Sequence, residues 1–226
     1  MPNFMMFVSR LLPAAGLLLL SATVLFAEDT MPDPGKPEQT LNQVLRQEKV
    51  TLAQIQAHLG ALSPEARVDQ STSLKRSQLA LLWQLAEANE DKARVEDFVP
   101  SEHPALEPVA FEGQNSLLMF RSFKKVFYRT SDGRVAGYND QAMAWLTGPG
   151  YYLMKDATPD PYIDYTEVPD EKPEGWPAIK ANESGFSRLV YGHMQDYMRR
   201  VHGNIFIGRA IKKGKETENY FVLARP

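Results

Sequence analysis

The chain has 226 residues, a net charge of −3 and no cysteine, so it is long enough for one well-packed domain or two small ones. The missing cysteines exclude disulfides, thiol nucleophiles and cysteine-based metal or haem sites. The short basic runs Lys124-Lys125 and Lys212-Lys213-Gly214-Lys215 are interpreted as solvated strand edges and turns. Because no basic stripe extends along the chain, we expect no nucleic-acid partner.

Residues 1–27 have the pattern of a secretory signal peptide. An apolar stretch over 11–27 follows Arg10, and the small Ala27 precedes a Pro-rich leader over 28–39. The sequence therefore predicts cleavage after Ala27 and export to the periplasm or the cell exterior. The alternative is membrane attachment through an uncleaved anchor at residues 4–27, since this longer stretch approaches the roughly 20 residues that a membrane helix needs.

Residues 40–97 are predicted to form a short helical segment. Thr40-x-x-Gln43 and Thr51-x-x-Gln54 match the capping box that begins a helix. Ser63-Pro64 is a further helix start, with proline at the first helical position. The longest helix is expected over 73–89, where apolar residues follow helical spacing.

After a charged connector, residues 106–226 are predicted to form an antiparallel β domain. This part is rich in aromatic residues, and its short apolar runs are separated by turn residues. Strands are expected at 108–112, 116–122, 124–130, 135–139, 142–147, 151–155, 162–167, 187–191, 205–211 and 220–224, with a helical turn or irregular strand at 193–201. The predicted fold is α+β, with the helical segment followed by an antiparallel barrel or a strongly curved sheet.

The common catalytic motifs are absent: no phosphate-binding glycine loop and no metalloprotease motif occurs. We therefore assign no catalytic residue, no metal ligand and no cofactor. His193, three residues before Asp196, could serve as a general base. Asp164 is another candidate acid, because strand alternation puts it on the same face as Tyr162. A polar histidine at a loop end and solvated loop carboxylates are the simpler interpretations.

Aromatic and arginine side chains of the β domain are the candidate ligand-binding residues. Either these aromatic residues only build the core, or they line a cavity with a few polar groups, as small-molecule sites do. The candidates for such a lining are Arg121, Trp145, Tyr151, Tyr191 and Arg209.

The last forty residues resemble a known class of barrel. The order is Leu189-Val190-Tyr191, then 196–201, then 205–208 and finally 220–223. This order resembles the ends of small calycin-like barrels, including GXWXG-type and plastid lipid-associated proteins. The middle of the chain, around Asn115-Ser116-Leu117 and 145–151, resembles uncharacterised bacterial exported proteins. The resemblance implies a lipocalin-like barrel that holds an apolar molecule, and it implies no reaction.

Three hypotheses for the function follow. The first is a non-enzymatic binder of a small apolar or amphipathic ligand outside the cytoplasm. The second is an extracytoplasmic enzyme that uses His193 with Asp196, or Asp164, as acid–base groups. The third is an envelope scaffold or interaction protein, for which helix 73–89 should expose a large apolar face.

Overall fold

The computed structural model describes residues 39–117, 121–141 and 144–226. Contacts divide the chain into residues 1–33 and residues 34–226, and every described residue belongs to the second unit. The expected signal peptide and nearly all of the leader lie outside the described residues. Within the described part of the chain, no helix is long and apolar enough to cross a membrane.

The helical segment contains four short helices that precede the barrel. They are α1 (Leu41–Val44), α2 (Leu52–Gly60), α3 (Pro64–Ser71) and α4 (Arg76–Ala86), followed by a 3₁₀ turn at Val95–Asp97. Both predicted capping boxes are formed: the Thr40 and Thr51 hydroxyls accept from the backbone N–H of Gln43 and Gln54. Ser63 caps α3 in the same way. These starts were predictable because a cap satisfies backbone donors locally.

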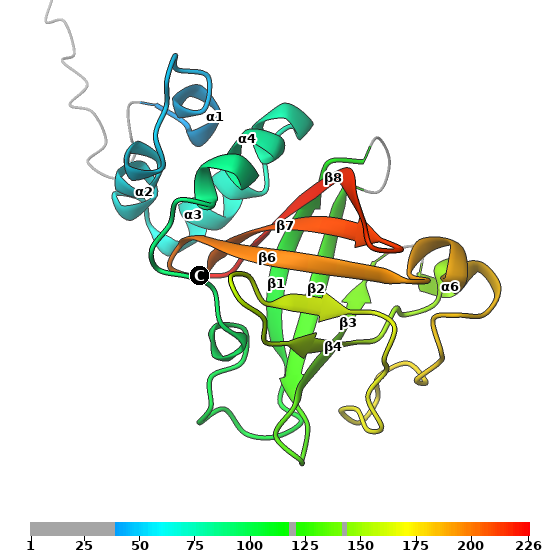
Figure 1. Ribbon diagram of the computed structural model, residues 1–226. Helices are drawn as coiled ribbons and strands as arrows, with labels where there is room; N and C mark the ends of the chain where they lie inside the picture. Colours follow the sequence, from blue (N-terminus) through cyan, green and yellow to red (C-terminus); the bar gives the residue numbers. More distant parts are fainter. Residues whose placement is uncertain (1–38, 118–120, 142–143) are drawn as a thin grey trace, which may run out of the picture. The chain divides into compact units, whose positions relative to one another are not determined.

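Eight antiparallel strands close into a barrel in which each strand pairs with its neighbours in sequence and β1 pairs with β8 (Figure 1). The strands are β1 (Val109–Asn115), β2 (Ser122–Arg129), β3 (Val135–Asp140), β4 (Tyr152–Lys155), β5 (Tyr162–Asp164), β6 (Met194–His202), β7 (Ile205–Lys212) and β8 (Lys215–Ala224). The expected α+β fold with an antiparallel barrel is therefore confirmed.

Three predicted elements differ from the structure. Residues 187–191 were expected as a strand, but they lie largely in helix α6 (Gly185–Val190). The described part of 142–147 is helix α5 (Ala144–Thr147), and no described residue between Ser116 and Arg121 belongs to a strand. By contrast, residues 193–201, expected as a helical turn or irregular strand, form most of β6, whose pairing with β7 shifts register between Arg200 and His202, so the second alternative is confirmed. The apolar run in α6 suggests a strand, but none of the side chains of this helix is buried.

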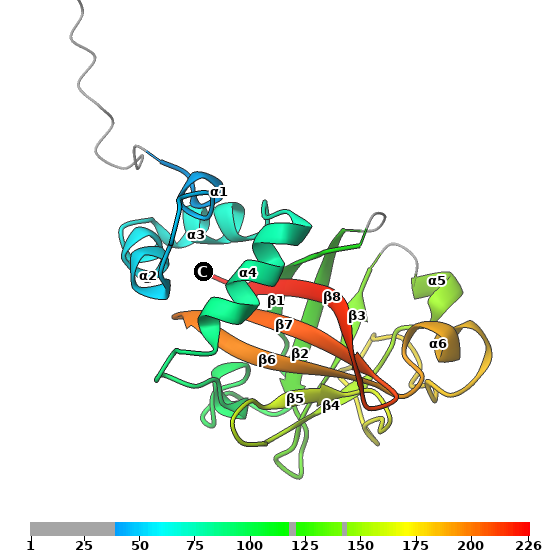
Figure 2. The same cartoon turned by 45° about the horizontal axis from the view of Figure 1, so that its top comes forward.

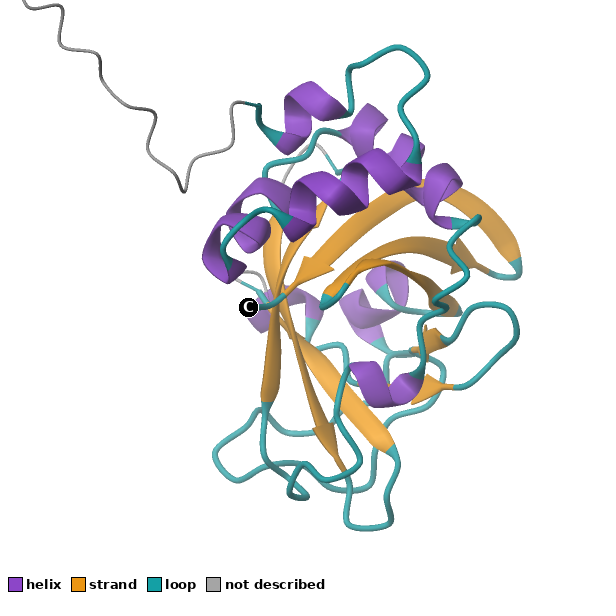
Figure 3. Ribbon diagram, turned by 90° about the vertical axis from the view of Figure 1, so that its left-hand side faces the viewer, coloured by secondary structure: helices purple, strands orange, loops and turns teal. Residues whose placement is uncertain are grey.

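The apolar core has an outer and an inner layer, one on each side of the barrel wall, and a small separate cluster of Tyr128, Ala136 and Leu153. The outer layer joins α1–α4 to the outward side chains of β6, β7 and β8, such as Ile207 and Val222. The inner layer fills the barrel with side chains such as Phe111, Phe127 and Met198. Figures 2 and 3 show the helices gathered over the side of the barrel that these three strands form. The strands alternate between the two layers because successive side chains point to opposite faces.

Arg199 on β6 fastens helix α4 to the barrel. Its guanidinium lies 3.9 Å from the ring centroid of Trp83, and its Nη1 donates to the Trp83 carbonyl at 3.0 Å. Its Nε donates to the buried Asp160 carboxylate at 2.8 Å. Arg199 thus links helix α4 to the barrel through a cation–π contact with Trp83 and a short ion pair with Asp160.

The two ends of the barrel are built differently. At one end, the connector before β1 places Phe98 inside the barrel against Phe111, Phe127 and Phe206. We call this the closed end. The open end carries the described residues between β1 and β2, those between β3 and β4 with helix α5, the 165–193 segment with α6, and the β7–β8 turn. The candidate functional site lies at the open end.

Candidate functional site

A cavity of about 300 Å³ lies inside the open end of the barrel. Inward side chains of β2, β3, β6, β7 and β8 line it together with residues of the loops that follow β1, β3 and β5. This volume is at the lower end of the range usual for small-molecule sites, about 300–1,000 Å³. The β domain is therefore hollow at one end and solid at the other.

Small residues keep this half of the barrel open and hold its aromatic rings in place. An added Cβ at Gly208 would lie 2.2 Å from Cζ of Phe221, and one at Gly113 would lie 2.6 Å from Cζ of Phe123. Each glycine therefore provides the space in which a neighbouring ring lies flat against the wall. Ala210, two residues beyond Gly208 on the same face of β7, lines the cavity itself.

A buried ion pair forms the polar floor of the cavity. Lys125 Nζ on β2 lies 3.2 Å from Asp196 Oδ2 on β6, and their side chains are 3% and 5% exposed. Lys125 also donates to Asn139 Oδ1 at 2.9 Å and to the Tyr165 hydroxyl. The Tyr165 hydroxyl in turn donates to Asp196 Oδ2 at 3.2 Å. We call these four residues the polar cluster, and all four line the cavity.

Aromatic rings surround the ammonium group of Lys125. Its Nζ lies 5.7, 5.1, 5.1 and 5.2 Å from the ring centroids of Phe123, Tyr152, Tyr165 and Phe221. Ring faces stabilise a cation at such distances. Burial nevertheless lowers the pKa of Lys125, and the Asp196 carboxylate only opposes that effect. The floor of the cavity therefore holds an amine that gives up its proton more readily than a surface lysine.

Tyrosine hydroxyls next to the cluster stay protonated. Burial raises the pKa of Tyr165 well above its usual value, and the Asp196 carboxylate acts in the same direction. Burial also raises the pKa of Tyr191 to about 12. Tyr191 stacks on Tyr165 with 5.2 Å between the ring centroids, and its hydroxyl accepts from Gln141 Nε2 at 2.7 Å. These groups offer a ligand neutral hydrogen-bond donors and acceptors.

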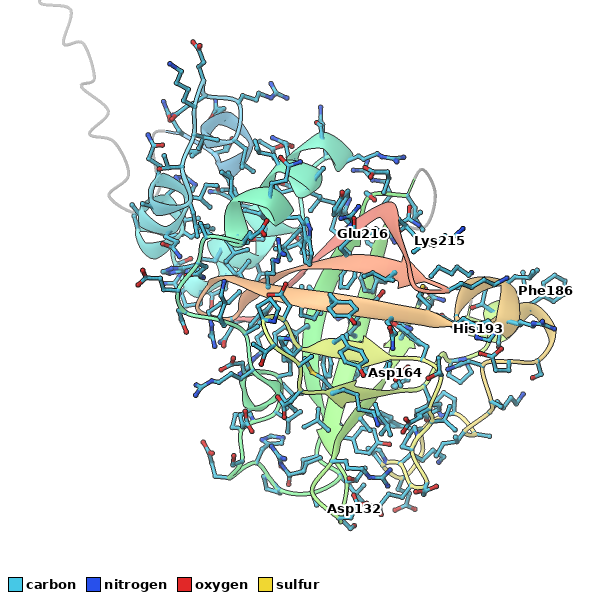
Figure 4. The ribbon with its side chains drawn as sticks, viewed as in Figure 1. Asp132, Asp164, Phe186, His193, Lys215 and Glu216 are labelled. Carbon is cyan, nitrogen blue, oxygen red and sulfur yellow. The ribbon has the colours of Figure 1, made fainter. Side chains whose placement is uncertain are left out.

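The rim of the cavity carries exposed apolar side chains beside polar ones such as Lys212 and Asn219. The large hydrophobic side chains that are exposed in the described residues all lie in the segments that connect strands at the open end, four of them in helices α5 and α6: Leu117, Leu146, Phe186, Leu189 and Val190. Leu117, Leu189 and Val190 also line the cavity, and Lys212 Nζ donates to the Leu189 carbonyl at 2.6 Å. Figure 4 shows Phe186, His193 and Lys215 on this side of the molecule and Asp132 at the far end.

The structure spreads the sequence-predicted ligand residues over several environments. Tyr191 lines the cavity. Tyr151 is fully buried, and its hydroxyl donates to the Pro177 carbonyl at 2.7 Å. Arg209 lies on the other face of β7 from Ala210 and pairs with Glu216 at 2.8 Å.

Arg121 and Trp145 complete that set of candidates. The Arg121 side chain is exposed and reaches towards the Leu74 carbonyl at 3.4 Å. The Trp145 side chain lies outside the described residues. Of the predicted ligand-binding residues whose side chains are described, only Tyr191 lines the cavity.

The predicted acid–base groups do not converge. His193 is 51% exposed and lies 3.5 Å from Glu183, whereas Asp196 points into the barrel towards Lys125. Asp164 accepts from the backbone and the hydroxyl of Thr166 at 2.9 and 2.7 Å, which stabilises the turn after β5. Among the described side chains, no group of three His, Asp or Glu residues is placed to hold a metal ion.

The apolar face of α4 is covered by the barrel. Leu79, Leu82 and Trp83 are buried against the outward side chains of β6–β8. The large exposed apolar face that a scaffold role would require is therefore not found on the described residues of this helix.

The sequence interpretation missed Lys125. The Lys124-Lys125 pair was expected to be solvated, and this is wrong for Lys125: only Lys124 is exposed, in a surface ion pair with Glu112. The signal was the alternation of Phe123, Lys125 and Phe127 on one strand face. Two aromatic residues that point into a barrel carry the residue between them into the interior as well.

Comparisons with known proteins add no relative. No protein family, no curated protein and no solved structure matches the chain. The resemblance to calycin-like barrels is therefore supported at the level of architecture, through the closed antiparallel barrel of eight strands.

Proposed function

We propose that the barrel binds a small amphipathic molecule with an uncharged, hydrogen-bonding head group and does not transform it catalytically. The observation that carries this proposal is the composition of the cavity, which has the polar cluster at its floor and apolar side chains at its rim. An amphipathic ligand would place its head on the floor and its apolar part at the rim. We also propose that the protein is exported and meets this ligand outside the cytoplasm.

The charge of the polar cluster selects the head group. Lys125 is already paired with Asp196, so the floor carries no net charge when both are ionised. A carboxylate or phosphate head would lose its hydration and face the Asp196 carboxylate at close range. A hydroxyl or carbonyl head only needs the donors and acceptors that Tyr165, Asn139 and Gln141 supply.

Fluorescence of the uncharged apolar dye N-phenyl-1-naphthylamine tests the proposal. We expect the dye fluorescence to rise when the protein is added, and 1-decanol to displace the dye at a concentration at least tenfold lower than decanoate. Absence of dye binding would overturn the proposal. Equal or stronger displacement by decanoate would overturn the assignment of an uncharged head group.

Two variants, each of which replaces an alanine by phenylalanine, locate the binding site. Ala210→Phe fills the cavity from β7, whereas Ala110→Phe adds the same ring at an exposed position of β1. We expect Ala210→Phe to weaken dye binding at least tenfold and Ala110→Phe to leave it within twofold of wild type. Circular dichroism should show that both variants are folded. Tight binding by folded Ala210→Phe would place the dye elsewhere and contradict the proposal.

A further inference from the structure

We infer that Lys125 forms a reversible imine with an aldehyde or ketone head group of the bound molecule, so that the cavity captures carbonyl compounds covalently. This inference rests on the proposed binding function and adds a chemical class to its ligand. It concerns bond formation at one amine and requires no redox cofactor.

The geometry presents an amine to the cavity together with a proton carrier. Lys125, Asp196 and Tyr165 all line the cavity, so a carbonyl head on its floor lies next to all three. Asp196 Oδ2 is 3.2 Å from Lys125 Nζ and can accept its proton. A buried lysine among apolar rings is the usual setting for a nucleophilic amine, because burial disfavours the charged form.

The reaction balances with Asp196 as the only proton carrier. The ammonium first gives a proton to the carboxylate, and the free nitrogen lone pair forms a C–N bond as the carbonyl π bond breaks. The resulting alkoxide takes the proton from Asp196, and the carboxylate then removes a second proton from nitrogen. Asp196 returns this proton to the hydroxyl, which leaves as water while the C=N bond forms. The products are a protonated imine, water and the Asp196 carboxylate.

The barrel stabilises this product through the contacts that hold the amine. The protonated imine keeps a single positive charge, so the Asp196 carboxylate remains its counter-ion. The ring faces of Phe123, Tyr152 and Phe221 surround the nitrogen at 5.1–5.7 Å. Imine formation therefore leaves the charge balance of the floor unchanged.

Two nearby lysines are internal controls for selectivity. Lys124 is the next residue on β2, but it is exposed, and its hydrogen bond to Glu112 raises its pKa. Lys212 lines the same cavity, yet its Nζ donates to the carbonyls of Leu189 and Val190 at the rim. If access to the cavity alone decided reactivity, Lys212 would be modified as readily as Lys125.

The test uses cinnamaldehyde as the probe on the full chain, with sodium cyanoborohydride present at near-neutral pH. The reductant converts an imine into a stable secondary amine, and peptide mass spectrometry then locates the adduct. We expect adduct formation at Lys125 to exceed that at Lys124 and Lys212 at least tenfold. Equal labelling of the three lysines, or no label at Lys125, would overturn the inference. Competition with thiols does not arise, because the chain has no cysteine.

Cinnamyl alcohol separates this inference from the proposed function. The alcohol has the same skeleton but cannot form an imine, so displacement of the dye by it reports binding alone. Displacement by the alcohol without an adduct at Lys125 would overturn the imine and leave the binding function standing. If neither the dye nor cinnamyl alcohol binds and no adduct forms at Lys125, both the proposed function and the imine are overturned.

Two variants complete the test. Lys125→Met should remove the adduct from this position, and Lys124→Met should leave labelling of Lys125 within twofold of wild type. Without reductant, the bound aldehyde should show the red-shifted absorbance of a protonated imine in Lys124→Met but not in Lys125→Met. Should Lys125→Met fail to fold, the peptide map of the wild-type protein still decides the question.

Discussion

The two ends of the barrel use the same strands for opposite purposes. At the closed end, Phe98 lies 5.6, 5.1 and 4.4 Å from the ring centroids of Phe111, Phe127 and Phe206. At the open end, two residues from Phe127 on the same face of β2, Lys125 sits in an ion pair beside a cavity. The lesson is that stability and binding are separated along the barrel axis.

The physical reason for this separation lies in the side chains that line the interior at each end. The connector before β1 supplies a ring that completes the apolar packing of the closed end. At the open end, inward glycine and alanine on β7 leave space, and polar side chains satisfy one another across it. A packed end resists unfolding, whereas a hollow end loses dispersion contacts but can admit a ligand.

The largest expected effect comes from opening the closed end. Phe98→Ala removes a fully buried ring, and we expect it to lower the free energy of unfolding by about 3–5 kcal/mol. Phe186→Ala, at a 60% exposed position of the open end, should change it by less than about 0.5 kcal/mol. Urea denaturation measures both. Similar losses in the two variants would contradict the assignment of stability to the closed end.

The next effect concerns the charge pair of the open end. Lys125→Met leaves the Asp196 carboxylate buried without its cation, which we expect to cost about 3 kcal/mol. Adding Asp196→Leu should restore at least half of this loss, because no uncompensated charge then remains. A double-mutant cycle by urea denaturation measures the coupling. A double variant less stable than Lys125→Met would show that the pair is not the cause.

A smaller loss of stability is expected when the glycine that contacts the Phe221 ring, Gly208, is replaced. Gly208→Ala should force this ring away from the wall, at a cost of about 1–3 kcal/mol, and should weaken dye binding. Gly60→Ala is the matched control, because its new Cβ would meet only ordinary contacts with His202 at 3.7 Å. That variant should be neutral or more stable by up to about 1 kcal/mol. Equal losses of stability would disprove the role assigned to Gly208.

The smallest effect is a dependence on pH. Burial lowers the pKa of Lys125 in the folded protein below its usual value of 10.5. Between the lowered pKa and 10.5, the unfolded chain binds the proton that the folded protein has lost, so stability rises with pH in this window. Relative to Lys125→Met, the wild type should gain at most about 1.4 kcal/mol per pH unit there. A difference that falls with pH would contradict the lowered pKa.

Local chemistry was predictable from the sequence. The capping boxes at Thr40 and Thr51 were predicted because the residues that satisfy a helix start lie three positions apart. The barrel was predicted because short apolar runs separated by turns are typical of an antiparallel fold. Strand β6 was predicted only as one of two alternatives, since its inward face mixes Met194 and Met198 with the charged Asp196. Hydrophobic alternation is weak wherever a strand contributes a polar group to the interior.

By itself, the sequence determined the class of the fold, the helix starts and most of the strands, because these depend on residues close together in the chain. Only the tertiary structure decided that Lys125 and Asp196, 71 positions apart, meet inside the barrel. It also decided that the 187–191 run forms part of a helix at the rim. Barrel closure sets which distant side chains share one interior, and that closure depends on the register of all eight strands together.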